Sequence, residues 1–405
     1  MLAFSSPPQV DAMACSPACA ALPPLPLPRN PASVCTSVPE ILERILSYLD
    51  RCSTMLRGDY ARVSKAWYAP ATRLRWRSLS VSHLSVTHRG GVPAAVRLAH
   101  RLKPNTLSLV RPTSISLNLP HVQDENVHLL SSFFSLVSHS ARSWTICDAH
   151  PRIISSLTAS LQGNVVTSLS VSMSRDGDEG LAVDNVLPNL QNLTFLEIRE
   201  ARETLTLAAI PTLRHLRRLR LFVNTDTWLS TAVYRSIGAC SNLASLSLLL
   251  DYRDSDAQDV LTHLRGLTSL ESLEIEMLPH EQEYMSLARH IRPALSTVEG
   301  PSWPSLQRLT LTWVDCRECS LGSTLRGLFP GLSKLVIKNG GRNDPVGDVG
   351  DLYLTCPGLV SVAITESAWV PSVIDRLRLD TLWRRPGSTG LDVEVGVDEL
   401  VTNDS

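Results

Sequence analysis

A six-residue pattern, Leu-x-x-Leu-x-Leu, recurs along the chain and constrains its fold more than any other feature. Six copies keep Leu at the first and middle positions and Leu or Ile at the third, and they begin at Leu193, Leu216, Leu243, Leu270, Leu306 and Leu332. Weaker copies begin at Val166 and Leu359, and degenerate ones lie at Ile115/Leu117 and Trp144/Ile146. Apolar residues that alternate over a short run indicate a β-strand buried on one face, so each copy predicts a short strand.

The copies are spaced almost evenly. Their middle residues, from Leu169 to Val362, follow one another at steps of 27, 23, 27, 27, 36, 26 and 27 residues. Between the copies the apolar residues take helical spacing, as in residues 260–267. Residues 105–400 therefore resemble leucine-rich repeats, whose period is roughly 20–29 residues. The resemblance implies an α/β fold, a solenoid in which each unit adds one strand to a parallel sheet and one helix beside it.

One step is longer than the others. Thirty-six residues separate Leu273 from Leu309, and prolines fall in or near this interval at positions 279, 293, 301 and 304. Proline interrupts regular structure, so a longer loop is expected here. An inserted loop on a solenoid is a candidate binding site, and simple tolerance of an insertion is the alternative.

The first 33 residues have a different composition. Residues 1–33 are rich in Pro, Ala and Ser and include the run LPPLPLP at 22–28. Such a segment buries too little apolar surface to offset its chain entropy, so a disordered Pro-rich tail is expected. A polyproline ligand for an aromatic groove is the alternative.

Helical patterns occupy residues 38–79. Ser37 and Glu40 have the spacing of a capping box, and Pro39 falls in the first turn, where its missing N–H costs nothing. Apolar residues then recur at steps of three and one up to Leu49, which predicts one amphipathic helix.

Two further helices are predicted in the same stretch. Residues 56–67 repeat apolar side chains at steps of four and three, and Pro70 is expected to open a third helix towards Trp76 and Leu79. Three helices in about 40 residues are marginal as a domain of their own. A partner or an adjoining domain is therefore expected to cover their remaining apolar surface.

Three segments of this stretch, VPEILERILSYLD, ARVSKAWY and ATRLRWRSL, together resemble an F-box of the fungal type. The resemblance predicts an F-box over residues 36–80, although Val38 replaces the usual leading Leu and Gly58 interrupts the second helical pattern. It implies docking on the Skp-family adaptor of a cullin–RING ubiquitin ligase. The residues that would form or support the docking surface are Val38, Pro39, Ile41, Ile45, Leu46, Leu49, Leu56, Val63 and Trp67.

The outward positions of the repeats define a second candidate site. If the leucines point inwards, the third, fifth and seventh residues of each copy point to the opposite face of the sheet. These positions alternate between basic, uncharged and acidic strands, and the candidate partner-binding residues among them are Arg218, Arg220, Phe222, Glu274, Glu276, Arg308, Lys334 and Lys338. Such a pattern would select a protein partner by charge complementarity. An ordinary solvated face is the alternative.

Other classes of function have little support in the sequence. The net charge of −1 does not indicate binding to nucleic acid or to an anionic membrane. No run of about 18 apolar residues is free of charged residues and prolines, so no transmembrane helix is predicted. The nine scattered cysteines indicate reduced thiols inside a cell, in the cytoplasm and/or the nucleus. Cys316 and Cys319 lack a second ligand pair, so no metal site is predicted, and no catalytic motif or cofactor site is found.

These observations lead to two hypotheses. In the first, the chain is no enzyme but the substrate-recognition subunit of an SCF-type cullin–RING E3 ubiquitin ligase. Its F-box docks on the adaptor and its repeats bind the target protein. In the second, the chain is a protein-interaction scaffold outside any ligase, and its N-terminal helices only cap the repeat array.

Overall fold

The computed structural model describes residues 65–75, 77–82, 111–118, 138–147, 154–155, 165–173, 179–201, 205–223, 229–251, 262–278, 285–286, 303–312, 314–315, 325–326, 329–338, 356, 358–365 and 392–396. The chain divides into two compact units, residues 1–71 and 72–405. The described part of the first unit is the start of helix α2 (Lys65–Arg75). All other described elements belong to the second unit.

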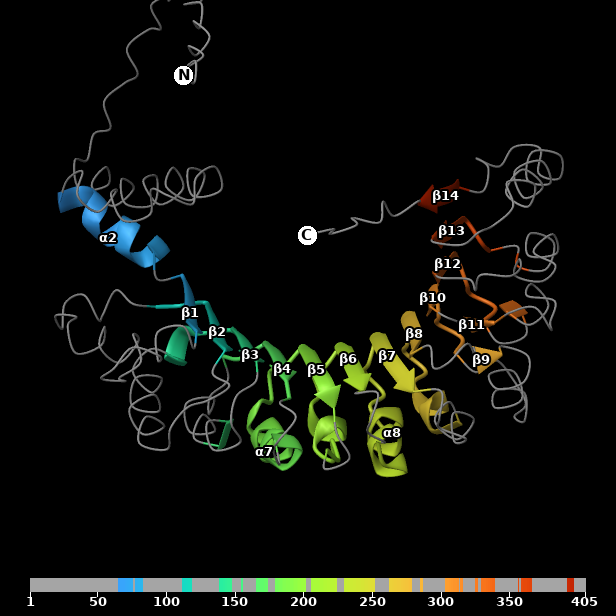
Figure 1. Cartoon of the computed structure of the whole chain (residues 1–405), viewed down its shortest axis with the longest axis horizontal. Coiled ribbons are helices and arrows are strands. Elements are labelled where there is room, and N and C mark those ends of the chain that lie inside the picture. The colour runs from blue at the N-terminus through green and yellow to red at the C-terminus, as the bar shows by residue number, and fades with distance from the viewer. Residues whose placement is uncertain are drawn as a thin grey trace, which may run out of the picture. The chain divides into compact units, whose positions relative to one another are not determined.

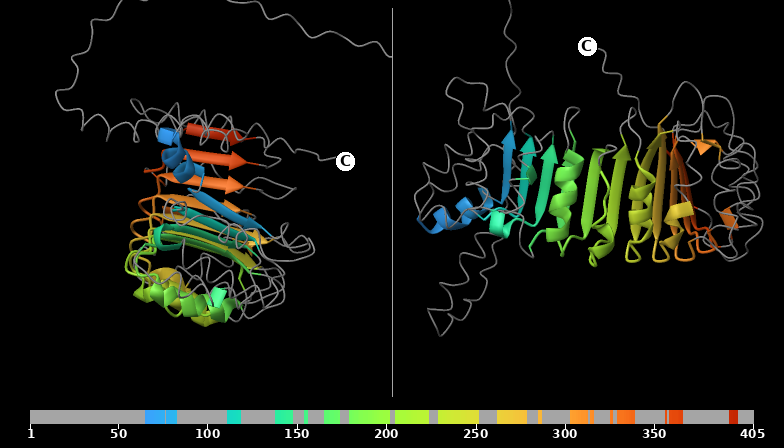
Figure 2. Two further views of the ribbon diagram at one scale, coloured as in Figure 1. Left: turned by 90° about the vertical axis from the view of Figure 1, so that its left-hand side faces the viewer. Right: turned by 90° about the horizontal axis from the view of Figure 1, so that it is seen from below.

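Twelve parallel strands form one continuous sheet in the second unit. They are β1 (Ser78–Ser82), β2 (Ser114–Asn118), β3 (Ser143–Cys147), β4 (Ser168–Ser172), β5 (Phe195–Ala201), β6 (Arg218–Val223), β7 (Ser245–Asp251), β8 (Ser272–Leu278), β10 (Arg308–Thr312), β12 (Lys334–Lys338), β13 (Ser361–Thr365) and β14 (Asp392–Gly396). Within this sheet each strand lies between the one before it and the one after it along the chain (Figures 1 and 2). The predicted fold class, an α/β solenoid with a parallel sheet, is confirmed.

The alternating leucines lie on one face of the sheet and form the core. The middle residue of each pattern lies opposite the middle residue of the next, as Leu219 does with Leu246 and Leu246 with Leu273. All three side chains are at most 1% exposed. The degenerate copies behave in the same way, because Leu117 and Trp144 are fully buried. Burial of one leucine contributes about 1.5–3 kcal/mol, so the pattern stabilises each strand separately.

Short helices lie on the side of the sheet that carries the leucines (Figure 1). They are α7 (Glu179–Val186), α8 (Thr231–Gly238) and the 3₁₀ helices η3 (Ser138–Ser140), η4 (Leu187–Asn189), η5 (Ile210–Thr212) and η6 (Leu264–Gly266). Some 3₁₀ turns continue an α-helical segment, since η4 follows α7 directly and η6 follows the helical residues 262 and 263. The described part of the predicted helical segment 260–267 is thus helical over residues 262–266.

A ladder of backbone hydrogen bonds joins the repeats just before each strand. The N–H groups of Arg217 and Arg218 both donate to the carbonyl oxygen of Thr194, each at 3.0 Å. The same arrangement recurs from the carbonyl of Arg77 to that of Ser333. Every strand of the main sheet from β2 to β13 is thus held to its predecessor in the same way, whatever the length of the intervening segment.

The repeats begin earlier than predicted. Ser78–Ser82 is a strand and pairs in parallel with β2, so the sheet starts before residue 105 and overlaps the end of the predicted 36–80 domain. The predicted third helix is wrong at both ends, because α2 contains Pro70 in its interior and Leu79 lies in β1. In this copy of the Leu-x-x-Leu-x-Leu pattern, Trp76 occupies the first position and Val81 the last, and only Leu79 is a leucine. The pattern is therefore too degenerate to predict the strand from the sequence.

The long step between repeats leaves the main sheet intact. Strand β10 pairs directly with β8, although 36 residues separate their middle leucines. The intervening segment contributes β9 (Met285–Ser286), which pairs with β11 (Val314–Asp315) in a separate two-stranded sheet. The chain returns to the core at Trp303, which is fully buried.

A search for membrane-spanning elements within the described residues identified no helix of sufficient length and apolar character.

Candidate protein-binding face of the sheet

The face opposite the leucines, here called the open face, carries the predicted partner-binding positions. Along β6 the leucines at 219 and 221 are buried while Arg218 and Arg220 are exposed, and Phe222 is half-buried. Glu274, Glu276 and Lys334 are half-buried and Arg308 is exposed, whereas Lys338 lies in β12 with its side chain outside the described set. The register places all eight residues on this face; their role in binding stays a prediction.

The strand register arranges the open face in rows. Arg218 lies opposite Ser245, which lies opposite Ser272, and that row continues to Arg308 and Lys334. The next row runs through Arg220, Ser247, Glu274 and Thr310. At the third, fifth and seventh positions of the repeats the face therefore changes from basic on β6 to uncharged on β7 and acidic on β8, as the sequence indicates.

The first strands present small hydroxyl side chains on this face. The positions of β2, β3 and β4 whose side chains point there include Ser114, Ser116, Ser143, Thr145, Ser168, Ser170 and Ser172, and all are half-buried. Short side chains leave the backbone of these strands accessible to a partner. This hydroxyl-bearing region is absent from the predicted site.

Glu197 on β5 is the most unusual residue of the open face. Its side chain is only 8% exposed. It accepts a hydrogen bond from the Ser170 hydroxyl at 2.7 Å and one from the Arg199 guanidinium at 3.2 Å, while Arg220 lies 4.0 Å away. A buried carboxylate is costly unless it is paired and hydrogen-bonded, and these contacts meet that requirement.

Phe195 orders a third arginine beside this carboxylate. The guanidinium carbon of Arg218 lies 5.3 Å from the centre of the Phe195 ring, a cation–π contact between β6 and β5. Arg199 and Arg220 keep side-chain exposures of 59% and 52%. Three arginines around one glutamate leave a formal charge of +2 at this place on the face.

The sequence prediction includes Arg218 and Arg220 but neither Glu197 nor Arg199. Reading the outward positions of the copy at Leu193 would have found both, because they are its fifth and seventh residues. Their ion pair could not have been found this way, since it depends on the side-chain geometry of neighbouring strands.

A second pair repeats the geometry of the first. The Ser247 hydroxyl on β7 donates to Glu274 on β8 at 2.9 Å, as Ser170 on β4 does to Glu197 on β5. Both pairs occupy the same row of the sheet, at the fifth position of consecutive repeats. Glu197 and Glu274 are thus each fixed by a hydroxyl group on the preceding strand.

The predicted adaptor-binding residues from Val38 to Val63 lie outside the described residues. Trp67 lies within α2, but its side chain is not among those described. Their role in docking stays a prediction.

The described cysteines show no sign of reactivity. Burial raises the pKa of the Cys240 thiol, which keeps it protonated, and Cys356 is buried as well. Cys316 and Cys319 fall outside the described residues. Over the described ranges no group of three or more His, Cys, Asp or Glu side chains could hold a metal ion.

Comparison with known proteins found distant similarity to solved structures, including the two described below. No family model and no curated protein matches the chain. It is similar to a chain of the crystal structure of the TLR13–ssRNA13 complex, with 14% identity and a TM-score of 0.37, over 72% of this chain and 45% of that one. It is also similar to a chain of the Rad7 and Elc1 complex in yeast, with 14% identity and a TM-score of 0.43, over 89% and 93%. The chain thus spans less than half the length of the TLR13 chain.

Proposed function

We propose that this chain is the substrate-recognition subunit of an SCF-type cullin–RING ubiquitin ligase. The F-box-like residues 36–80 dock on a Skp-family adaptor, and the open face of the sheet binds the protein to be modified. The chain then works inside the cell, in the cytoplasm and/or the nucleus.

One observation carries the protein-binding half of this proposal. Charged side chains of both signs stand on one face of β5, β6 and β8, in rows set by the parallel register. Among the described helices of residues 77–396, those that Figure 1 labels lie on the other side of the sheet. An extended face with patterned charge provides the electrostatic complementarity that fixes a partner and its orientation.

The proposed role in a ligase rests on the order of the F-box-like segments within residues 38–79. Its chemistry requires no catalytic residue in this chain. A receptor subunit contributes proximity and orientation by holding the target near the enzyme that carries ubiquitin. The chain is accordingly proposed not to be an enzyme and to need no cofactor.

Adaptor binding tests this half directly. The full chain is expected to co-purify with a Skp-family adaptor, and the double substitution Leu46→Ala and Trp67→Ala is expected to reduce capture by at least about tenfold. The physical reason is the loss of two large apolar side chains at the interface, each worth about 2–5 kcal/mol when buried. Capture is measured by pull-down with purified adaptor.

The matched control is Arg73→Ala, an exposed position on α2 outside the predicted docking set. Thermal unfolding of each variant shows whether the repeat unit remains folded. Unchanged adaptor capture by the double variant, or no capture by the unmodified chain, would contradict the ligase role and leave the scaffold hypothesis.

A further inference from the structure

We infer that the cluster of Arg199, Arg218 and Arg220 binds an extended acidic segment whose Asp or Glu residues occupy alternate positions. The inference deepens the proposed function, on which it rests, by naming the chemistry of the segment that the open face recognises. The positions, the charges and the contacts of the three arginines support this inference.

The three arginines occupy three successive levels of the sheet. Arg218 pairs with Phe195 at the first level and Arg220 with Glu197 at the second. Arg199 belongs to the third level, where it pairs with Ser172. Successive levels are two residues apart along a strand, or roughly 6.6 Å. The backbone positions of the three arginines therefore fall on three successive levels, and β5 departs from the register of β6 between Ile198 and Ala201.

An extended peptide has the same repeat. Its alternate side chains point to one side and are also roughly 6.6 Å apart. Three acidic residues at positions i, i+2 and i+4 can thus each meet one arginine. Arg199 and Arg220 both reach towards Glu197, because their nitrogens lie 3.2 Å and 4.0 Å from the same carboxylate oxygen. These two nitrogens are therefore at most about 7 Å apart, which is within the reach of two carboxylates at positions i and i+2.

The contacts within the cluster orient the arginines without neutralising them. Glu197 offsets one of three positive charges, and its own carboxylate is already held by Ser170. Arg218 is held by the Phe195 ring, 5.3 Å from its guanidinium carbon, and this contact brings no negative charge that would offset the arginine. Each guanidinium has five N–H donors in a planar fork that matches a carboxylate.

The residues around the three arginines favour a ligand with several separate single charges over a ligand with one doubly charged group. A phosphate would bring about two negative charges to one point beside Glu197, whereas Asp or Glu residues spread single charges over the three levels. On one side of the cluster the small side chains of β4, such as Ser172, leave room for a peptide. On the other side the acidic residues of β8, Glu274 and Glu276, repel it, so the segment lies over β4–β7.

Fluorescence anisotropy with two labelled peptides tests the inference on the full chain. One peptide carries the core Asp-Ser-Asp-Ser-Asp and the other the core Ser-Asp-Asp-Asp-Ser, so charge and composition are equal. The alternating peptide is expected to bind more tightly, by about threefold or more, because only it places a carboxylate at each level. Equal affinity for the two peptides would overturn the inference.

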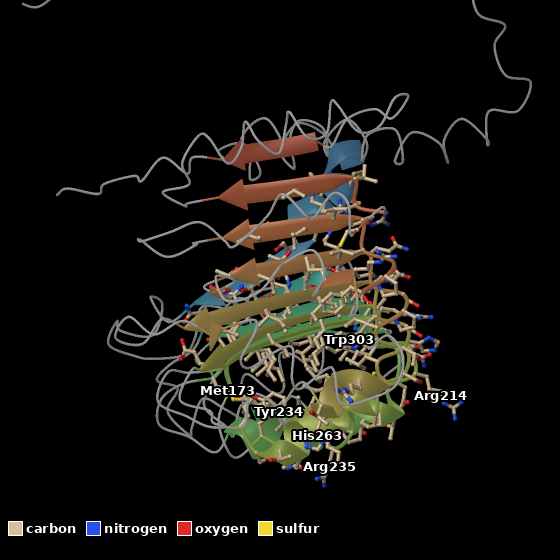
Figure 3. All side chains as sticks on the ribbon, turned by 90° about the vertical axis from the view of Figure 1, so that its right-hand side faces the viewer. Met173, Arg214, Tyr234, Arg235, His263 and Trp303 are labelled. Carbon is tan, nitrogen blue, oxygen red and sulfur yellow. The ribbon has the colours of Figure 1, made fainter. Side chains whose placement is uncertain are left out.

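Substitutions locate the binding site. Arg199→Ala, Arg218→Ala and Arg220→Ala are each expected to weaken the alternating peptide about two- to fivefold, the range of an exposed ion pair, and the triple variant by at least about tenfold. The triple Arg→Lys variant keeps the charge and is expected to fall in between, because lysine lacks the planar fork. The matched control is Arg235→Ala, since Arg235 is exposed on α8 and lies on the helix side of the sheet (Figure 3).

Two further outcomes decide against the inference. Unchanged binding by the triple alanine variant would place the peptide elsewhere, and tighter binding of a peptide with a single phosphoserine would favour a phosphate site. The assay contains no adaptor, so its result is independent of F-box docking. Failure of the adaptor pull-down with intact peptide binding would refute the ligase role and leave the acidic-segment site standing.

Discussion

At the scale of single residues, Asp184 shows how one side chain holds a repeat in an unfavourable conformation. Its Oδ1 accepts from the backbone N–H of Leu207 at 2.7 Å, and its Oδ2 accepts from the N–H and hydroxyl of Thr206 at 2.7 Å and 2.9 Å. Leu207 has a φ of 53°, a left-handed conformation that costs a non-glycine residue about 1–2 kcal/mol. The carboxylate on α7 therefore fixes the backbone that leads into η5.

Substitution of Asp184 is expected to destabilise the repeat unit. Asp184→Ala should lower the free energy of unfolding by about 1–3 kcal/mol, because the hydrogen bonds to the strained backbone are lost. Asp184→Asn should cost less, since its amide oxygen still accepts one of them. Urea unfolding of the full chain measures the change. Asn185→Ala, at the exposed neighbouring position, is the control, and an equal effect of the two alanine variants would refute the proposed role.

At the scale of elements, neighbouring repeats meet through glycine rather than side chains. Helix α8 ends at Gly238, and a β-carbon there would lie 1.9 Å from the carbonyl oxygen of His263, just before η6. A β-carbon on Gly266 would in turn lie 2.5 Å from the carbonyl oxygen of Gly238. The two backbones thus approach more closely than any side chain would allow.

The close approach reverses the usual effect of a helical substitution. Gly→Ala in a helix ordinarily stabilises by about 1 kcal/mol. Gly238→Ala is expected to destabilise by at least about 1–3 kcal/mol, because two backbones must separate. Thermal unfolding shows the sign. Gly358→Ala is the matched control, since its added carbon would make an ordinary 3.4 Å contact with Leu332. Equal stabilisation by both substitutions would contradict the packing described for α8.

At the scale of the whole repeat unit, Trp303 joins the repeats on either side of the long segment between β8 and β10. Its indole N–H donates to the carbonyl oxygen of Leu264 at 3.1 Å, 39 residues earlier. Its ring stacks on Phe329 with centroids 5.6 Å apart and an interplanar angle of 12°. Trp303 therefore contacts the repeat before it and the repeat after it, from within the core (Figure 3).

Substitution of Trp303 is expected to destabilise both neighbouring repeats. Trp303→Ala is expected to lower the free energy of unfolding by about 3–5 kcal/mol, and Trp303→Phe by about 1–3 kcal/mol because the Leu264 carbonyl loses its donor. Urea unfolding measures both, with the exposed Ser305→Ala as control. A Phe variant as stable as the control would show that the hydrogen bond contributes nothing.

The sequence predicts the strands well because their cause is local. Leu219 and Leu221 alternate with arginines, and one buried face is enough to explain that alternation. The start of the sheet is harder to predict, because in β1 only Leu79 and Val81 alternate. The burial of Glu197 has no local signal, because it depends on Ser170, 27 residues earlier, and on Arg220.

The in-order sheet also sets a scale of length for recognition. Neighbouring strands are about 4.8 Å apart, so the lateral distance between any two charges on the open face is a whole number of strand spacings. Arg220 and Glu274 are two strands apart, and the position of β7 that lies between them is uncharged. Loss of that one 27-residue unit would bring the glutamate beside the arginine and cancel the charge contrast. In such a molecule, gain or loss of a repeat is a change of specificity.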